Sequence, residues 1–326
     1  MVFWFPAACP WKEIVASKAD EVTRPRKSAA EWVTHRERGS MTMLRIMTFL
    51  SLRLGRSGGR LFLYLIAAYF FTFAPTARRH ARAYLRRALG REPTAADRFR
   101  HVLTFATTIH DRVYLLKERF DLFDISLDGE SPVREALQAG NGAFLMGSHV
   151  GSFEIIRTVG RRQPGLRVAM AMYEDNARKV NAMLVAINPV AKPDVIALGH
   201  IDAMLKIQES LDRGTFVGVL GDRTLGNEAT QQVEFLGQPA RFPVGAMRAA
   251  AIMRRPVIFM IGLYRGGNRY HVAFERLADF SAVEPRQREA AVREAIERYA
   301  AVLEKYVRSD PYNWFNFFDF WRSGND

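Results

Sequence analysis

From about residue 142 onwards, short apolar runs alternate with segments in which apolar residues recur at helical spacing. Uniformly apolar runs bounded by polar residues are typical of strands buried on both faces of a sheet. Such runs occupy residues 142–147, 167–171, 195–198, 215–220, 257–263 and 270–274. Helical patterns occupy residues 152–162, 176–187, 201–213, 243–254 and 285–308. This alternation predicts an α/β fold, with a mixed, mostly parallel sheet flanked by helices.

The first part of the chain has a different pattern. Residues 1–40 become dense in charges and show no sustained apolar period, so we expect a poorly ordered extension. Residues 61–77 carry no charge and lie between arginines. Seventeen uncharged residues are at the lower limit for spanning a bilayer, and Pro75 shortens the helical part further. The aromatic residues of this stretch and its flanking arginines favour a hydrophobic helical anchor in a membrane interface, whereas a buried core helix is the alternative.

Two further helices are expected before the α/β pattern begins. A basic helix spans residues 77–89 and ends at Gly90, and another spans residues 94–117 with Thr94 as its cap. The predicted division of the chain is an extension over 1–40, a membrane-associated helical region over 41–120, and an α/β domain over 121–326.

The charge of the chain indicates an anionic partner. Lys and Arg total 47 against 34 Asp and Glu, which gives a formal net charge of +13. Nucleic acid, an acidic protein and an anionic bilayer all suit such a surplus. The arginine clusters flank an apolar segment and do not alternate with stacking aromatics, which argues against nucleic acid.

The cysteine content limits which disulfides and metal sites the chain can form. The single cysteine, Cys9, excludes a disulfide within the chain and is consistent with a reducing compartment. Neither cysteine pairs nor closely spaced histidines suggest a structural metal site. We therefore expect neither a metal nor a cofactor.

The segment 141–154 carries the clearest chemical signal. An apolar strand runs into a Gly/Ser-rich turn and a helix begins at Ser152, which places His149 at the carboxyl end of a strand, where open α/β folds bind ligands. Residues five apart in one helix point about 140° away from each other, so His149 and Glu154 can meet only if His149 lies on the turn. A carboxylate on one imidazole nitrogen would then fix the tautomer and leave the other nitrogen as a base. A structural histidine and a glutamate favoured by the helix dipole are the alternative.

The same His-x4-Glu spacing after a strand resembles the His-x4-Asp/Glu signature of the lysophospholipid-type acyltransferase superfamily. The wider similarity is to its lipid A biosynthesis acyltransferase branch and covers about residues 32–321. It includes residues 36–40, 142–154, 219–222 and 233–245, the last of which contains the pattern Phe-Leu-Gly-x-Pro-Ala-x-Phe-Pro-x-Gly.

The resemblance implies roles for individual residues. His149 would act as the general base on an acceptor hydroxyl, and Glu154 would hold the imidazole. Asp222, at the end of a later strand, would line the same cleft and position the acceptor or a cation. A plain turn residue is the alternative for Asp222.

Other residues near the turn would serve the reacting carbonyl. Gly147 and Gly151 would keep bulk away from it, and backbone N–H groups between them, or Arg223, would stabilise the oxyanion. Because no serine or cysteine stands in a Gly-x-Ser-x-Gly elbow, direct transfer is favoured over a covalent acyl-enzyme.

The implied reaction moves a fatty acyl group from an acyl carrier protein thioester to a hydroxyl on a membrane lipid, at the cytoplasmic face of the inner membrane. Acyl carrier protein is acidic, which gives the basic surface a second use. A hydrolase that uses water at the same His149 and Glu154 pair is the alternative.

Two features depart from the pattern of the branch. Residues 182–201 contain Lys192 as their only basic residue, where the branch usually has an arginine. Residues 311–321 are rich in aromatics, where the branch tends to finish in basic residues. We interpret this tail as core packing and interface anchoring in preference to ligand contact. The acceptor is therefore left open between lipid A, another lipid and a polyketide-like conjugate.

Overall fold

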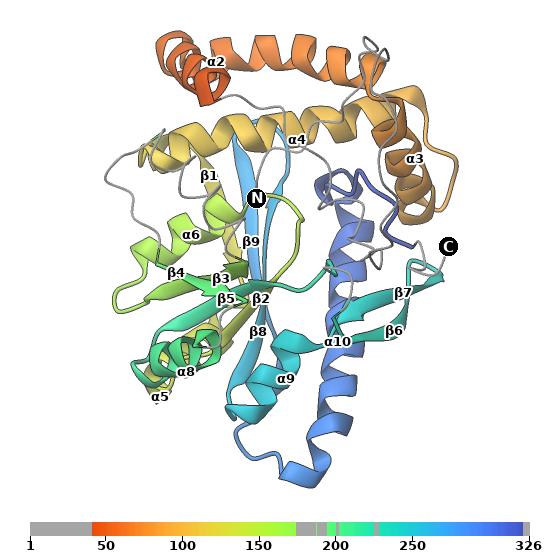
Figure 1. Cartoon of the computed structure of the whole chain (residues 1–326). Coiled ribbons are helices and arrows are strands. Elements are labelled where there is room, and N and C mark those ends of the chain that lie inside the picture. The colour runs from red at the N-terminus through yellow and green to blue at the C-terminus, as the bar shows by residue number, and fades with distance from the viewer. Residues whose placement is uncertain (1–40, 174–186, 188–193, 200–201, 225–227, 322–326) are drawn as a thin grey trace, which may run out of the picture.

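The computed structural model describes residues 41–173, 187, 194–199, 202–224 and 228–321, and its centre is a seven-stranded sheet (Figure 1). The strand order is β1-β9-β8-β2-β5-β3-β4, and every neighbouring pair is parallel except β8 and β9. The strands are β1 (Asp124–Asp128), β2 (Phe144–Gly147), β3 (Val168–Tyr173), β4 (Val195–Leu198), β5 (Phe216–Leu220), β8 (Pro256–Tyr264) and β9 (Arg269–Asp279). The predicted mixed, mostly parallel sheet is confirmed.

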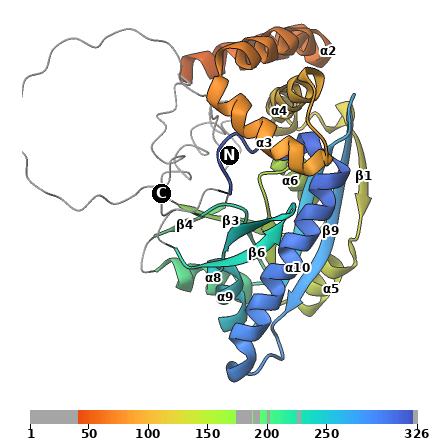
Figure 2. The ribbon, with the colours of Figure 1, turned by 90° about the vertical axis from the view of Figure 1, so that its right-hand side faces the viewer.

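The helices of the α/β part cover both faces of this sheet. They are α5 (Ser131–Ala139), α6 (Phe153–Arg162), α8 (Ala203–Asp212), α9 (Gly245–Ile252) and α10 (Arg288–Ser309). Figure 2 shows α10 and α5 on opposite sides of β9. Because α10 packs in one hydrophobic cluster and α5 in another, each face of the sheet has its own core.

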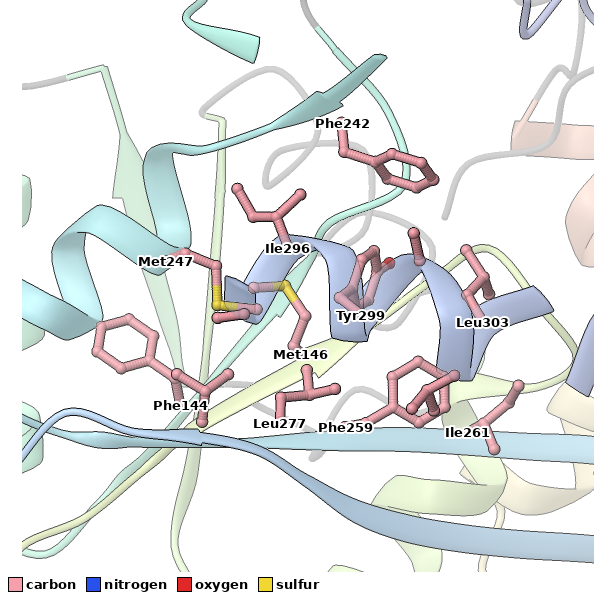
Figure 3. Packing of buried hydrophobic residues seen from close by; sticks show 14 of the residues in the cluster. Phe144, Met146, Phe242, Met247, Phe259, Ile261, Leu277, Ile296, Tyr299 and Leu303 are labelled. Atoms are coloured by element: carbon pink, nitrogen blue, oxygen red, sulfur yellow. The ribbon is translucent and has the colours of Figure 1, made fainter. Parts of the chain in front are cut away.

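Successive side chains of the central strands point to opposite faces of the sheet, and both faces are buried. The sequences of these strands are therefore continuous apolar runs. On β8, Phe259 and Ile261 point towards α10, while Ile258 and Met260 belong to the cluster on the opposite face. Figure 3 shows the first of these faces, where Tyr299 of α10 lies among side chains of the sheet. A strand buried on both faces has no position at which a polar residue is favoured.

Three helices precede the sheet: α2 (Met41–Phe73), α3 (Pro75–Leu89) and α4 (Ala95–Leu116). Figure 1 shows α2 and α4 side by side across one end of the sheet. The helix α2 is broken at Gly55, whose φ of 70° is not helical. Pro75 stands in the first turn of α3, Gly90 ends it at a φ of 66°, and Thr94 and Asp97 form a capping box at the start of α4. These two helices agree with the ranges expected from the sequence.

The predicted anchor falls on α2 and the start of α3. Among the described residues, no single helix is long and apolar enough to cross a bilayer. The segment Ser51–Phe73 together with α3 satisfies that test by length and composition, although the two are bent by 96° at their junction. Large apolar side chains of α2 are exposed at Phe49, Leu52, Leu54, Leu61, Phe62, Tyr64, Leu65, Tyr69 and Phe73. The anchor, like the three-part division of the chain, stays a prediction.

Some elements were not expected, and others lie outside the described residues. The edge strand β1 and the antiparallel hairpin of β6 (Thr230–Phe235) and β7 (Gln238–Pro243) were not expected from the sequence. The hairpin turns at Leu236 and Gly237, which both have positive φ. The extension over 1–40 and nearly all of the helix expected over 176–187 lie outside the described residues.

Candidate active site

The order of the strands brings His149 and Asp222 together. His149 follows β2 by two residues and Asp222 follows β5 by two residues. These strands are parallel neighbours, and their register pairs Gly147 with Leu220. The two side chains therefore leave the same edge of the sheet at matching positions, although 73 residues separate them in sequence.

Asp222 holds His149 through two hydrogen bonds. Nδ1 of the His149 ring lies 2.8 Å from Oδ1 of Asp222, and the His149 backbone N–H donates to Oδ2 at 3.0 Å. The indole N–H of Trp314 donates to the same Oδ2 at 3.0 Å. Asp222 is fully buried, while the His149 side chain is 16% exposed. Three N–H donors thus surround one buried carboxylate.

The electrostatics of the pair define which imidazole nitrogen can act as a base. Burial, followed by the charge of Arg223, lowers the pKa of His149 to about 4, against the opposing attraction of Asp222. Burial raises the pKa of Asp222, but the interactions with His149 and Arg223 outweigh it and hold the pKa well below its usual range. The ring is therefore neutral at pH 7. Because an ionised carboxylate only accepts hydrogen bonds, the ring proton lies on Nδ1 and the lone pair lies on Nε2.

The contact expected between Glu154 and His149 is not the one that forms. Glu154 lies in the first turn of α6, as expected, but its carboxylate oxygens are 3.7 Å from Nε of Arg112 and 3.7 Å from Nη1 of Arg157. The sequence argument chose the carboxylate nearest along the chain, whereas the sheet presents Asp222 to the ring. The structure thus corrects the pairing, and a catalytic role for Glu154 stays a prediction.

Asp222 also occupies a different place from the one expected. We expected it to line the cleft and position the acceptor or a cation, but both of its oxygens bond to His149 and Trp314. A carboxylate with this environment orients the imidazole. The alternative interpretation, that Asp222 is a turn residue without a specific partner, does not fit these contacts either.

The aromatic tail is part of the site, which the sequence did not predict. The backbone N–H of Gly151 donates to the carbonyl of Asn313 at 2.8 Å, and that of Phe315 donates to the carbonyl of His149 at 3.1 Å. These bonds place the buried Trp314 beside Asp222. Packing of the tail in the core agrees with our interpretation, but the indole hydrogen bond to Asp222 was missed. The density of aromatics was the only sequence signal for it.

Arg223 lies at the same edge and supplies a half-buried positive charge. Burial lowers the pKa of Arg223 to about 10, so the guanidinium stays charged at pH 7. It donates from Nη2 to the Phe315 carbonyl at 3.3 Å and stacks 4.9 Å from the ring centre of Phe318. Nε of Arg223 and the hydroxyls of Ser148 and Ser152 are buried without a hydrogen-bond partner in the described part of the chain. Unpaired buried polar atoms are costly, which makes these atoms candidates for ligand contacts.

Close packing requires a glycine at position 151, whereas hydrogen bonds hold the backbone of Gly147. Gly151 has a φ of 65°, and a Cβ there would lie 1.9 Å from the carbonyl oxygen of Gly262. The Gly147 carbonyl accepts hydrogen bonds from the Gly221 N–H and the Tyr299 hydroxyl. Since the N–H of Gly151 is bonded to the tail, it is not a free oxyanion donor. Contact of either glycine with substrate stays a prediction.

Comparison with known proteins agrees with the resemblance noted above. No match was found among curated proteins. The family model of the bacterial lipid A biosynthesis acyltransferases matches residues 33–323, which include the whole sheet, the His149 and Asp222 pair and the aromatic tail. The chain therefore belongs to the bacterial lipid A biosynthesis acyltransferase family and is an acyltransferase.

Proposed function

We propose that this enzyme transfers a fatty acyl group from an acyl carrier protein thioester to a hydroxyl of a membrane lipid or lipid-like acceptor, with His149 as the general base. The observation that carries the proposal is the hydrogen bond of 2.8 Å between Nδ1 of His149 and the buried Asp222. It leaves Nε2 as the nitrogen that can accept a proton. We assign the orienting role to Asp222 in place of Glu154.

The transfer proceeds in one displacement on the thioester. The acceptor hydroxyl donates its proton to Nε2 of His149 while its oxygen attacks the thioester carbonyl carbon. The ionised Asp222 stabilises the imidazolium that forms. The carbon–sulfur bond then breaks, and the leaving thiolate takes the proton from the imidazolium. The base thus returns to its neutral form with no covalent acyl-enzyme.

The oxyanion of the tetrahedral intermediate needs a donor or a positive charge within a short distance. Arg223 satisfies the chemical requirement, since its guanidinium is half-buried and charged, and its Nε has no hydrogen-bond partner among the described residues. The backbone N–H groups of His149, Gly151 and Ser152 are bonded within the fold to Asp222, Asn313 and Gly262. We therefore favour Arg223 over these N–H groups for stabilisation of the oxyanion.

The surface of the N-terminal helices supports a membrane location. The exposed apolar side chains of α2, such as Leu61 at 71% and Leu65 at 69% exposure, suit insertion into a bilayer interface. Arg79, Arg82 and Arg86 of the adjoining α3 are also exposed and suit anionic headgroups. An acyl carrier protein donor would place the reaction at the cytoplasmic face of the inner membrane.

The test follows labelled acyl groups from an acyl carrier protein thioester into a total membrane lipid extract. Wild-type protein is compared with His149→Ala and with His80→Ala, a histidine of α3 outside the site. A labelled lipid that is lost only in His149→Ala supports the proposal, and its mass identifies the acceptor. Release of free fatty acid without any labelled lipid would make the enzyme a hydrolase. Equal products from both variants would refute His149 as the base.

A further inference from the structure

A cavity is lined by residues other than the His149 and Asp222 pair. Its volume is about 740 Å³, and it is bounded by α2, α4, β1, the turn between β8 and β9, and the segment that follows α10. Neither His149, Glu154, Asp222 nor Arg223 lines it. Cavities of roughly 300–1,000 Å³ are typical of small-molecule sites. This cavity therefore has the size of a small-molecule binding site.

The lining of the cavity carries a surplus of positive charge. Four arginines and two aspartates contribute to it, which leaves a formal surplus of two positive charges: Arg60, Arg100, Arg265, Arg269, Asp124 and Asp310. Arg265 and Asp310 form an ion pair at 3.4 Å. Within the described residues, the other three guanidiniums have no carboxylate within ion-pair distance. Uncompensated guanidiniums around a cavity favour an anionic ligand.

The surrounding fold holds two of these arginines in place. Arg60 donates to the Tyr264 hydroxyl at 2.8 Å and also to the Gly267 carbonyl in the turn between β8 and β9. The guanidinium of Arg100 stacks over the ring of Tyr312, 4.5 Å from its centre. Because these partners are uncharged, they fix the guanidiniums without neutralising them. Planar, preorganised guanidiniums match the geometry of phosphate oxygens.

The position of the cavity beside α2 indicates which kind of phosphate-bearing ligand could reach it. Tyr64 of α2 lines the cavity and is also 52% exposed, beside the apolar side chains of Leu61 and Leu65. A lipid whose chains lie along the exposed side of α2 can therefore place its headgroup in the cavity. We propose that this cavity binds the phosphate group of an anionic membrane lipid, an inference that rests on the proposed location of α2 at a bilayer surface.

The test measures binding to full-length protein in a nonionic detergent by isothermal titration calorimetry. The titration contains no acyl thioester, so no acyl transfer can occur and the result does not depend on the acyl-transfer proposal. The probes are dihexanoyl phosphatidylglycerol, inorganic phosphate and dihexanoylglycerol, which lacks a phosphate. The site variant is Arg100→Gln with Arg269→Gln. The matched control is Arg134→Gln with Arg162→Gln, which lowers the net charge equally at exposed arginines outside the cavity.

We expect saturable binding of the phosphatidylglycerol, no binding of dihexanoylglycerol, and affinity lower by roughly tenfold or more in the site variant alone. Thermal unfolding of both double variants checks that the fold is retained. If inorganic phosphate binds as tightly as the lipid and competes with it, the site recognises a soluble phosphate and the lipid source is wrong. Equal weakening in both variants, or no binding to the parent protein, would refute the site.

Discussion

Replacing Asp222 by asparagine tests the central pair of the site without changing its shape. Two N–H donors, the His149 backbone and the Trp314 indole, point at Oδ2, each at 3.0 Å. The amide oxygen of Asn must take that position, because an amide NH2 group there would face both donors. The NH2 group then faces Nδ1 of His149, which must accept. The ring proton consequently moves to Nε2, and the base is lost.

The expected loss of kcat follows from the free energy needed to rotate the new amide so that its oxygen faces Nδ1 of His149. Turning the amide to restore the active tautomer leaves two buried N–H donors unsatisfied, at about 1–3 kcal/mol each. A total of about 2–6 kcal/mol corresponds to a loss of roughly 30-fold to 10⁴-fold in kcat. Asn also lacks the negative charge that stabilises the imidazolium, so we expect a loss towards the upper end. The same exchange in a Ser-His-Asp triad costs about 10⁴.

The assay compares kcat for acyl transfer in Asp222→Asn and Glu154→Gln, together with the thermal midpoint of each. Asp222→Asn should lose rate while it keeps its fold, and the ¹⁵N shifts of His149 should report a proton on Nε2. Glu154→Gln removes a negative charge beside the buried Arg112 and the nearby Arg157. It should therefore lower the free energy of unfolding by about 3–5 kcal/mol.

Two results would refute this reasoning. The first is Asp222→Asn within fivefold of wild-type rate while Glu154→Gln is inactive and fully stable. Glu154 would then be the partner of His149 in the working enzyme. The second concerns Trp314, whose N–H helps to fix the amide. The rate lost on Asp222→Asn should be smaller in a Trp314→Phe background, and an equal loss would show that the indole does not orient the amide.

Three further outcomes are expected. The kcat/KM should rise as pH increases through about 4 and stay flat from about pH 5 to 7, because burial keeps His149 neutral there; a midpoint near 6.5 would contradict this. Burial lowers the pKa of His101 to about 4, so the unfolded state binds more protons between about pH 4 and 6.5. The urea-derived free energy of unfolding should therefore fall across that window as pH falls, and it should fall less in His101→Gln. Gly151→Ala should cost several times the roughly 1 kcal/mol of Gly140→Ala, measured by thermal unfolding, because both glycines have positive φ but only Gly151 meets a carbonyl oxygen.

The sequence was informative where local pattern decides the structure. Buried strands show as apolar runs, and the turn between β2 and α6 shows as glycine and serine around His149. Strand order is not a local property, since it depends on how the crossover helices place each strand in the sheet. The partner of His149 therefore could not be identified from spacing alone, and the nearest carboxylate in sequence was chosen over Asp222.

The unexpected strands are those whose burial differs from the centre of the sheet. β1 is an edge strand that alternates exposed and half-buried residues, so it lacks an apolar run. β7 begins and ends near prolines, Pro239 and Pro243, and pairs only with β6. Proline is tolerated in such a two-stranded hairpin because each strand has a free edge. A search for apolar runs cannot detect either case.

The structure also changes what can be inferred about the acceptor from the aromatic tail. A tail rich in aromatic rings would suit an apolar or aryl acceptor if the rings were available to it. Trp314, Phe315 and Phe317 are instead buried, and Trp314 is bonded to Asp222. Their frequency is explained by packing and by the hydrogen bond from Trp314 to Asp222. The arginines around the cavity are not explained in this way, and the proposed lipid site gives them a role in headgroup recognition.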